Sequence, residues 1–352
     1  MRSLKYAFVL ALPAITWWSF DAHGWLTFMP FFYIFVGIPL VELFIQPDAG
    51  NLEKIEEKRQ RDNIIYDFLI YLMVPTQLFT LGYFLYTITD PALSTVGFTG
   101  RIMSMGLCCG VLGINVGHEL GHRYKKYERW MAKINLMTTL NMHFMHEHNK
   151  HHHLAVSTPD DPATSKYGEP LYIFWFRSIT GVYAWAWKLE RDKLKRKGVP
   201  FFSFQNQMIT DHIIEFGLVG FIAVFFGFTA MASFILAALI GHLVLETVNY
   251  IEHYGLVRKK VGDRYERVTP KHSWNSDHIV GRLHLFELSR HSDHHYLPGR
   301  KYQILRHMDE SPQMPTGYPG MMILAFVPPL WFAVMNKRVK ALNTTQAQSV
   351  AS

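Results

Sequence analysis

Cysteine is nearly absent from this sequence: the 352 residues include two, Cys108 and Cys109, which stand side by side in an apolar run. A disulfide framework and a spaced set of thiolate ligands for zinc or an iron–sulfur cluster are therefore excluded. The chain also lacks a CxxC pair, a Rossmann glycine fingerprint and a haem-attachment motif. Electrons for any redox chemistry would therefore have to come from a separate protein.

Charged residues are also scarce, at 18% of the chain against about 25% for typical soluble domains. Hydrophobic residues make up 49% and aromatic residues 15%. The apolar residues are concentrated in long blocks, which alternate with strongly polar stretches. This pattern excludes an ordinary water-soluble chain and predicts a membrane protein with a large aqueous part.

Six apolar runs have close to the roughly 20 residues that an α-helix needs to cross a bilayer. The sequence therefore predicts an all-α integral membrane protein with six transmembrane helices, of which the last two form a tight hairpin. A later apolar run at 320–335 is short and contains Pro328 and Pro329, so we expect it to lie at the interface or on the aqueous part. The six predicted spans are 4–20, 24–45, 66–88, 102–120, 212–229 and 231–250.

Lysine and arginine are distributed unevenly between the connecting segments. Residues 21–23, 89–100 and 230 contain none, whereas the N-terminus and the long segments are rich in them. Because cationic flanks stay on the cytoplasmic side, we expect both termini and all large segments in the cytoplasm, beneath a bacterial inner membrane. The expected organisation is transmembrane helices 1–4 in 1–120, a cytoplasmic metal-binding segment in 121–211, helices 5–6 in 212–250, a second cytoplasmic metal-binding segment in 251–335, and a polar, frayed tail in 336–352.

Histidine is unusually frequent, and many of the 19 histidines fall in four clusters: HELGH, HEHNKHHH, NYIEHYG and RHSDHH. In HELGH, His118 and His122 are four residues apart, so both can reach one metal ion from one helix face. In HxxxHH and HxxHH, the first and last histidines share a face, and the middle one can point to a neighbouring centre. Nine or ten clustered imidazoles exceed the ligands of a single ion and indicate two metal ions.

A carboxylate stands close to each histidine cluster. Metal-bound histidine usually donates its other N–H to such an acceptor, which fixes the ring and makes it more basic. We therefore expect four carboxylates to support the metal ligands: Glu119, Glu147, Glu252 and Asp293.

Two other classes of metal protein remain open at this point. HELGH also matches HExxH, the motif in which two histidines hold zinc and the glutamate acts as the general base of a protease. A catalytic zinc takes three protein ligands, however, which would leave most of the clustered histidines unused. A protein that stores or transports metal would bind ions without any turnover.

The three boxes HELGH, HNKHHH and HSDHH resemble those of the integral-membrane non-haem di-iron desaturases, hydroxylases and monooxygenases. NYIEHYG and PTGYPG are similar to the alkane and xylene monooxygenase branch, and the resemblance to alkane 1-monooxygenases covers residues 60–335. It implies two iron ions, O₂ as co-substrate and conversion of alkanes to primary alcohols, with related enzymes of methyl-arenes or fatty-acyl chains as alternatives. The implied iron ligands are His118, His122, His148, His152, His153, His253, His291, His294 and His295.

The resemblance also implies an external electron supply, from rubredoxin and its NAD(P)H-dependent reductase. Rubredoxins are acidic, so the basic runs Arg123–Arg129 and Lys188–Lys197 are candidate docking surfaces. Contact with lipid headgroups explains both runs equally well. His151 departs from the family pattern, which has glycine there; we expect an additional surface histidine or a rearranged ligand.

An alkane carries no group that can form a hydrogen bond, so its site must be an apolar channel between the spans. Helical phase predicts channel residues on the face of the fourth span that leads to the first histidine pair, with weaker candidates on the second span. A polar stripe on the sixth span and just after it, formed by His242, Glu246, Asn249 and His253, is also expected to run from the metal site toward the channel. Ordinary helix packing and structural hydrogen bonds are the alternatives. The predicted channel residues are Ile34, Phe35, Cys108, Val111, Leu112, Asn115, Glu246 and Asn249.

Overall fold

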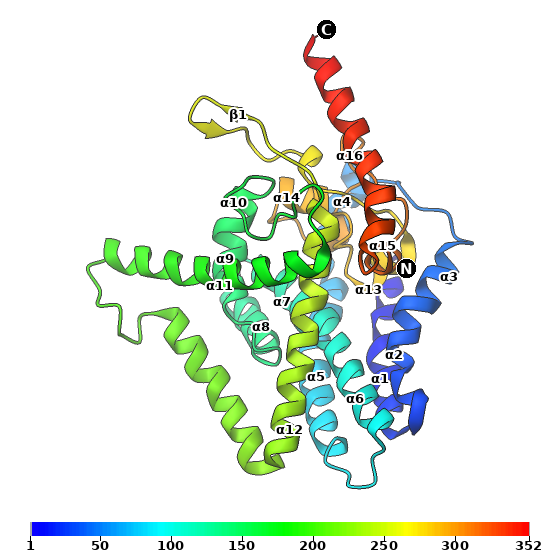
Figure 1. Cartoon of the computed structure of the whole chain (residues 1–352), viewed down its shortest axis with the longest axis vertical. Coiled ribbons are helices and arrows are strands. Elements are labelled where there is room, and N and C mark those ends of the chain that lie inside the picture. Colours follow the sequence, from blue (N-terminus) through cyan, green and yellow to red (C-terminus); the bar gives the residue numbers. More distant parts are fainter. Residues whose placement is uncertain (1, 352) are drawn as a thin grey trace.

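The computed structural model describes residues 2–351, with side chains as far as Thr344. Helices account for almost all of its regular structure, as the sequence predicts (Figure 1). The two described strands, β1 (Lys260–Val261) and β2 (Arg264–Tyr265), form a small antiparallel hairpin. This hairpin projects from the end of the molecule at which the C-terminal helix emerges (Figure 1).

The N-terminal apolar region consists of short helical pieces of different types. Arg2–Leu10 forms a 3₁₀ helix (η1) that leads into α1, and a second run begins after His23 with another 3₁₀ turn and changes helix type three times. Prolines at the start of two of these pieces are compatible with a helical first turn. The elements are α1 (Ala11–Asp21), η2 (Gly24–Phe28), α2 (Met29–Phe32), the π-helical η3 (Tyr33–Gly37) and α3 (Ile38–Glu42).

The remaining apolar helices are longer. α5 (Ile64–Thr87) is a single helix, and α6 (Thr95–Cys108) continues through the π-helical η4 (Cys109–Ile114) into α7 (Asn115–Gly121). α12 (Gln207–His253) contains 47 residues, and its chain reverses direction at Gly227, whose φ of 85° favours glycine (Figure 1). The two arms of α12 correspond to the predicted hairpin of the fifth and sixth spans.

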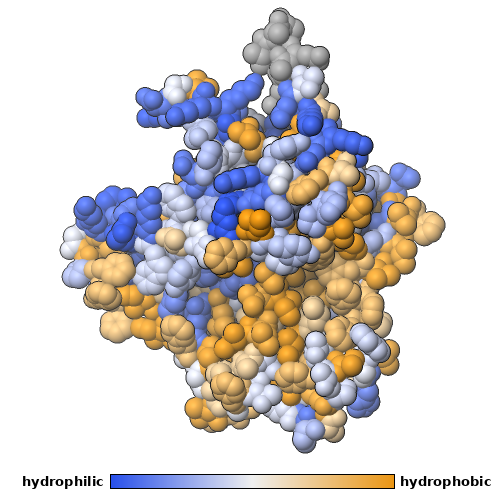
Figure 2. Space-filling view, in the orientation of Figure 1, coloured by the Kyte–Doolittle hydropathy of each residue, from blue (hydrophilic) through white to orange (hydrophobic). Residues whose placement is uncertain are grey.

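Within the described residues, four helical runs are long and apolar enough to cross a membrane: Gly24–Glu42, Ile64–Thr87, Thr95–Gly121 and Gln207–His253. A fifth is added if α15 (Tyr318–Ala325) and α16 (Pro328–Ala351), which meet at 119°, are counted together. The predicted span 4–20 is divided between η1 and α1, so it does not form one long helix. Figure 2 shows hydrophobic side chains covering the half of the molecule formed by these long helices, and hydrophilic side chains gathering at the opposite end.

Further helices cover the polar end of the bundle, and most of them are short. α11 crosses α12 and is the longest of them (Figure 1). They are α4 (Lys54–Arg61), α8 (Lys126–Met137), α9 (Phe144–Glu147), the π-helical η5 (His148–His152), α10 (His153–Ala155), α11 (Leu171–Arg196), η6 (Pro270–His272), α13 (Ile279–His284), α14 (His291–Tyr296) and η7 (Tyr302–Ile304).

The C-terminal region differs from the prediction. The break at Pro328 and Pro329 is confirmed, because α15 ends at Ala325 and the two prolines open the first turn of α16. The expected polar tail at 336–352 is helical as far as Ala351, because α16 continues through it, and Val339 is buried against the rest of the molecule. Residue 352 lies outside the described part of the chain.

Close approach of two helices fixes the position of the polar end. α12 packs against α6 and η4 at small residues: a Cβ on Gly110 would lie 2.7 Å from the side chain of Val244, and one on Gly241 would lie 2.6 Å from Cβ of Cys109. Glycine at both positions therefore lets the backbones approach without a clash. This contact brings the end of α7 and the end of α12, which both carry histidines, to the same side of the bundle.

Candidate metal centre

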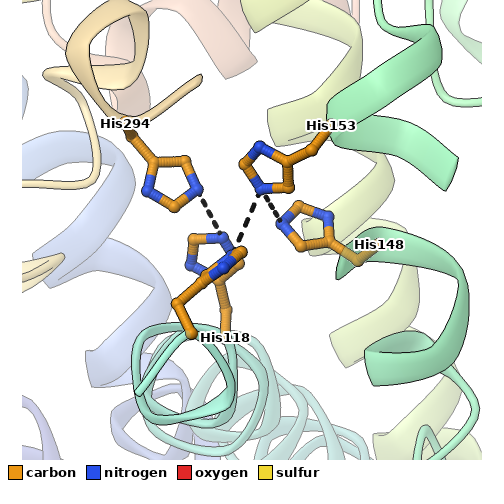
Figure 3. Close-up of side chains that lie close together, drawn as sticks. His118, His148, His153 and His294 are labelled. Atoms are coloured by element: carbon orange, nitrogen blue, oxygen red, sulfur yellow. Dashed lines mark hydrogen bonds between the residues drawn. The ribbon is translucent and has the colours of Figure 1, made fainter. Parts of the chain in front are cut away.

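The structure brings all nine implied ligand histidines together at the polar end of the bundle. They come from α7 and the residue after it, from η5 and α10, from the last residue of α12, and from α14. Figure 3 shows the rings of His118, His148, His153 and His294 pointing toward one another from three separate segments. A set of residues spread over 178 positions, from His118 to His295, thus forms one compact cluster.

The nine histidines divide into two groups, and within each group the potential ligand nitrogens lie within 4.8 Å of one another. The first group, called here the five-histidine group, is His118, His122, His148, His153 and His294. The second, the four-histidine group, is His152, His253, His291 and His295.

Neighbouring histidines in the sequence belong to different groups. His152 and His153 separate in this way, and so do His294 and His295, because consecutive helical residues point in different directions. In η5 the chain forms a π-helix, whose i→i+5 pattern brings residues five apart onto one face. His148 and His153 therefore meet, with their Nε2 atoms 3.1 Å apart. This is the alternation that the spacing of the two boxes predicts.

The ring nitrogens approach one another as closely as ligands of one ion do. The Nε2 atoms of His118 and His294 are 3.0 Å apart, and those of His253 and His291 are 3.2 Å apart. Two nitrogens that each lie 2.0–2.1 Å from a shared ion would be separated by about 2.9–3.4 Å. Nε2 of His152 is buried and has no hydrogen-bond partner. The donor atoms therefore fit metal ions in both groups.

Burial favours the neutral form in several of these imidazoles. It lowers the pKa of His122 to about 3, with a further contribution from the charge of His152. Neutral imidazole is the form that binds metal, so the site is prepared for ions at neutral pH. Burial, followed by the neighbouring histidines, likewise places the pKa well below its ordinary value in His148, His153, His291, His294 and His295.

Two of the four predicted supporting carboxylates do not contact a histidine. Glu119 accepts hydrogen bonds from the Arg123 side chain, with Nη2 at 2.7 Å, and from the backbone N–H of Tyr302. Asp293 accepts from the Arg306 side chain, with Nη2 also at 2.7 Å. Arginines from nearby segments therefore engage Glu119 and Asp293 and compete with the histidines for these charges.

The other two predicted carboxylates lie nearer the histidines. Glu252 is placed with Oε2 3.1 Å from Nε2 of His291, and its Oε1 accepts a hydrogen bond from Tyr318. Because Nε2 of His291 faces His253, Glu252 lies on the inner side of the four-histidine group and not behind it. Glu147 is buried, and its Oε1 has no hydrogen-bond partner.

One supporting residue was missed by sequence reasoning. Asp161 accepts a hydrogen bond from Nδ1 of His152 at 2.9 Å and another from the hydroxyl of Thr164. Although burial acts to raise it, the pKa of Asp161 stays below its usual range because of His152 and these hydrogen bonds. Since Nδ1 donates to Asp161, Nε2 of His152 is left free to bind a metal ion. Asp161 follows the second box by eight residues, in the segment DDPATS. A search for carboxylates directly beside the histidine boxes therefore does not identify it.

His151 is neither a surface residue nor a member of either group. Its ring is buried and stacks on Trp185 of α11, with ring centroids 3.8 Å apart and an interplanar angle of 19°. The expectation of an additional surface histidine is therefore wrong, because α11 covers this side of η5.

Two small apolar cavities lie beside the histidine groups. One, of about 40 Å³, is lined by His118, His148 and His291 together with apolar residues of η4 and α12. The other, of about 50 Å³, lies farther from the histidines and is almost entirely apolar. Val111, Val244, Val248 and Leu285 line both. Of the predicted channel residues, Asn115 and Asn249 line the first cavity, Ile34 and Phe35 the second, and Val111 both.

Three predicted channel residues lie elsewhere. Cys108 packs against Thr16, Leu112 is enclosed in the core, and Glu246 accepts hydrogen bonds from Ser178 and Asn249. The prediction counted 3.6 residues per turn, but η4 is π-helical over 109–114, and its wider turn rotates the residues that face the cavity.

The first residue of the polar stripe on α12, His242, also has a structural role. Nε2 of His242 lies 2.9 Å from the backbone oxygen of Thr139. This interhelical hydrogen bond was the alternative to a channel position.

A basic groove of about 640 Å³ joins the two basic runs of the sequence. Its cationic lining comes from the region of α8, from η5 and from the end of α11. The cations are Lys126, Arg129, Lys133, Lys150, Lys193 and Lys197.

Comparisons with known proteins agree with the architecture of this site. Residues 93–325 match the profile of the Fatty acid desaturase family. The alkane 1-monooxygenase of Pseudomonas putida is 39% identical over 95% of this chain and 85% of its own, and alkane 1-monooxygenase 1 of Alcanivorax borkumensis is 40% identical over 86% and 75%. The xylene/toluene monooxygenase hydroxylase component of Pseudomonas putida is 28% identical over 77% and 73%. The chain therefore belongs to the alkane 1-monooxygenase family, within the larger Fatty acid desaturase family.

Proposed function

We propose that this protein is a membrane enzyme that hydroxylates the terminal methyl group of alkanes to primary alcohols, with O₂ as co-substrate and two iron ions as cofactor. One observation carries the proposal: two groups of histidines, most of them buried, lie directly beside an apolar cavity. Family membership supports the same reaction, because seven relatives at 37–40% identity bear the name alkane 1-monooxygenase.

Each histidine group would hold one iron ion. When bound, the two irons supply with O₂ the oxidising power that a strong C–H bond requires and that amino-acid side chains lack. The ligands are the five histidines 118, 122, 148, 153 and 294 for one ion, and the four histidines 152, 253, 291 and 295 for the other.

The side chains around the cavities would position the alkane. A molecule without polar groups is held by apolar contact alone, and Val111, Val244 and Val248 provide such contact between the two cavities. Rotation of these side chains would join the cavities into one passage. In that passage Ile34 and Phe35 lie toward the far end, and the terminal methyl group lies beside the histidines. The buried apolar residues that line most of both cavities would disfavour water in this passage.

The arrangement in the membrane follows from the same helices. We propose six crossings, with η1 and α1 together as the first and the two arms of α12 as the fifth and sixth. The segments 121–211 and 251–335 then form the metal-binding part in the cytoplasm, below a bacterial inner membrane. The distribution of lysine and arginine between the connections supports this orientation.

Electrons would arrive from rubredoxin, which its NAD(P)H-dependent reductase keeps reduced. The basic groove supports docking of such an acidic carrier, because it combines cations from both runs beside the second histidine box. Lys150 of this groove is separated from His152 of the four-histidine group by a single residue.

Other activities are less well supported by the site. In a zinc protease Glu119 would act as a base, but here its carboxylate is engaged by Arg123 and the N–H of Tyr302. Methyl-arenes are the second candidate substrate class, because one relative is named a xylene/toluene monooxygenase component. Fatty-acyl chains are a third, through the larger family.

The direct experiment supplies the detergent-purified protein with octane, O₂, rubredoxin, reductase and NADH. We expect 1-octanol, and no product when rubredoxin is left out. Product from p-xylene but not from octane would move the substrate to methyl-arenes, and product from an acyl chain alone would move it to fatty acids. Bound metal without any of these products would contradict the enzyme assignment.

A further inference from the structure

A third cluster of metal-binding side chains lies next to the four-histidine group but shares no residue with it. Glu147, His151 and Asp161 each offer one ligand atom, and these three atoms lie within 4.8 Å of one another. All three residues are buried, and Glu147 and Asp161 are 1% and 2% exposed. The proposed hydroxylation uses none of them as an iron ligand.

The carboxyl group of Glu147 is not satisfied by the protein. Its Oε1 is buried and has no hydrogen-bond partner, although buried polar atoms normally have one. Asp161, the other acid of the cluster, is also buried, and two carboxylates at close range repel each other unless a proton or a cation lies between them. The cluster therefore requires either a proton on one of its carboxyl groups or a bound cation.

His151 is oriented as a ligand would be. Its Nε2 lies 3.1 Å from the backbone oxygen of Asp160. A carbonyl oxygen only accepts, so Nε2 carries the hydrogen and Nδ1 keeps a free lone pair. Metal-binding histidines commonly donate their second N–H to a backbone carbonyl in this way. Stacking on Trp185 holds the ring in place.

Asp161 still has capacity for a ligand bond. Its Oδ2 accepts from His152 and Thr164, and its Oδ1 accepts only the backbone N–H of Ala163. A carboxylate oxygen has two lone pairs, so Oδ1 retains one.

We propose that Glu147, His151 and Asp161 form a third metal site, which binds a divalent ion of the zinc or manganese class. Two carboxylates and one neutral imidazole carry a charge of −2, which such an ion balances. Nitrogen and oxygen ligands suit these metals, and three protein ligands leave at least one position for water. The site is independent of the hydroxylation reaction, but Asp161 would connect it to His152 and thus to the four-histidine group.

The test uses the iron-loaded, full-length protein in detergent, dialysed against zinc chloride and then against metal-free buffer. We expect about one zinc ion per chain in addition to the iron. Zinc K-edge absorption should show one imidazole and otherwise oxygen ligands. Zinc that had replaced iron in a histidine group would instead show four or five imidazoles.

The decisive variant is His151→Ala, with His143→Ala as the matched control. His143 precedes the second box, and its ring also contacts an aromatic ring of α11, that of Tyr183, although edge to face; it lies outside all three clusters. We expect His151→Ala to weaken zinc binding at least tenfold and to leave the iron content unchanged. His143→Ala should bind zinc like the wild type. If His151→Ala loses its iron through misfolding, Glu147→Gln, which keeps the side-chain shape, takes its place.

Three results would overturn the third site: no zinc beyond the iron content, zinc that persists in His151→Ala, or zinc surrounded by several imidazoles. The iron content of the same samples tests the proposed function separately, so the two proposals can fail independently.

Discussion

The two histidine groups have the same kind of ligand but different surroundings. The five-histidine group consists of imidazoles alone, whereas the four-histidine group has Asp161 behind His152 and Glu252 beside His291. Neutral imidazoles leave the charge of an ion uncompensated, and nearby carboxylates offset it. The comparison indicates that the two ions are not equivalent: the one in the four-histidine group should be bound in the more charge-balanced environment and should be the easier to oxidise.

The largest expected effect comes from replacing one of two adjacent histidines, each of which belongs to a different group. His294 and His295 are neighbours on α14 but belong to different groups. We expect His294→Ala and His295→Ala each to lower the iron content from about two ions per chain to about one and to reduce alkane hydroxylation more than about 100-fold, beyond the loss typical of outer-sphere changes.

Metal analysis and Mössbauer spectra of ⁵⁷Fe-loaded protein check this result, because each variant should lose a different signal. Identical remaining signals in the two variants would contradict the division into two groups.

A second experiment removes the carboxylate that distinguishes the four-histidine group. Asp161→Asn should weaken iron binding in that group about 10–100-fold, the usual effect of losing the acceptor behind a metal-bound histidine. Asp211→Asn is the matched control, since Asp211 also bonds a buried histidine, His146, at 2.7 Å, but outside both groups. Competition with an iron chelator measures the affinity. Equal losses in both variants would point to a general defect in packing.

The third expectation concerns pH and the metal-free protein. The pKa of His122 is about 3 in the folded chain against 6.5 when exposed. Between these values the unfolded state binds more protons, so stability rises with pH and falls as the pH is lowered from 6.5 toward 3. Each such histidine contributes up to about 1.4 kcal/mol per pH unit.

Thermal unfolding of the metal-free protein should therefore show lower stability at pH 5.0 than at pH 7.5, and bound iron should not reduce this loss, because iron also binds only the neutral histidines. Equal stability at the two pH values would contradict the view that these histidines are buried in their neutral form.

The smallest expected effect comes from a substitution in the lining of the two apolar cavities, which leaves both histidine groups intact. Val111 lines both cavities, so Val111→Phe should block the passage between them and reduce activity on long alkanes about tenfold relative to short ones, with unchanged iron content. Val224→Phe is the control, because Val224 is 79% exposed on the outer surface of α12. Product analysis with a series of alkanes measures the preference. An unchanged preference would place the substrate elsewhere.

Most of the histidine site could be predicted from the spacing of the histidine boxes. His291 and His295 belong to one group and His294 to the other, because residues four apart share a face of an α-helix, which follows from residue numbers alone. The predicted channel face failed at Cys108 and Leu112 because a π-helical stretch cannot be deduced from apolar periodicity. The partners of the carboxylates could not be predicted for a different reason. Glu119 and Asp293 bind arginines that the box spacing does not reveal. Asp161 bonds His152 only because of how the chain folds after the second box.

The most direct test of the two-iron site is ⁵⁷Fe Mössbauer spectroscopy of the purified protein, combined with iron K-edge absorption and a metal count. We expect about two irons per chain, in two quadrupole doublets of equal area, with four to five imidazoles per iron on average. A single bound zinc ion, or one iron with a single doublet, would contradict a site that holds one iron in each histidine group.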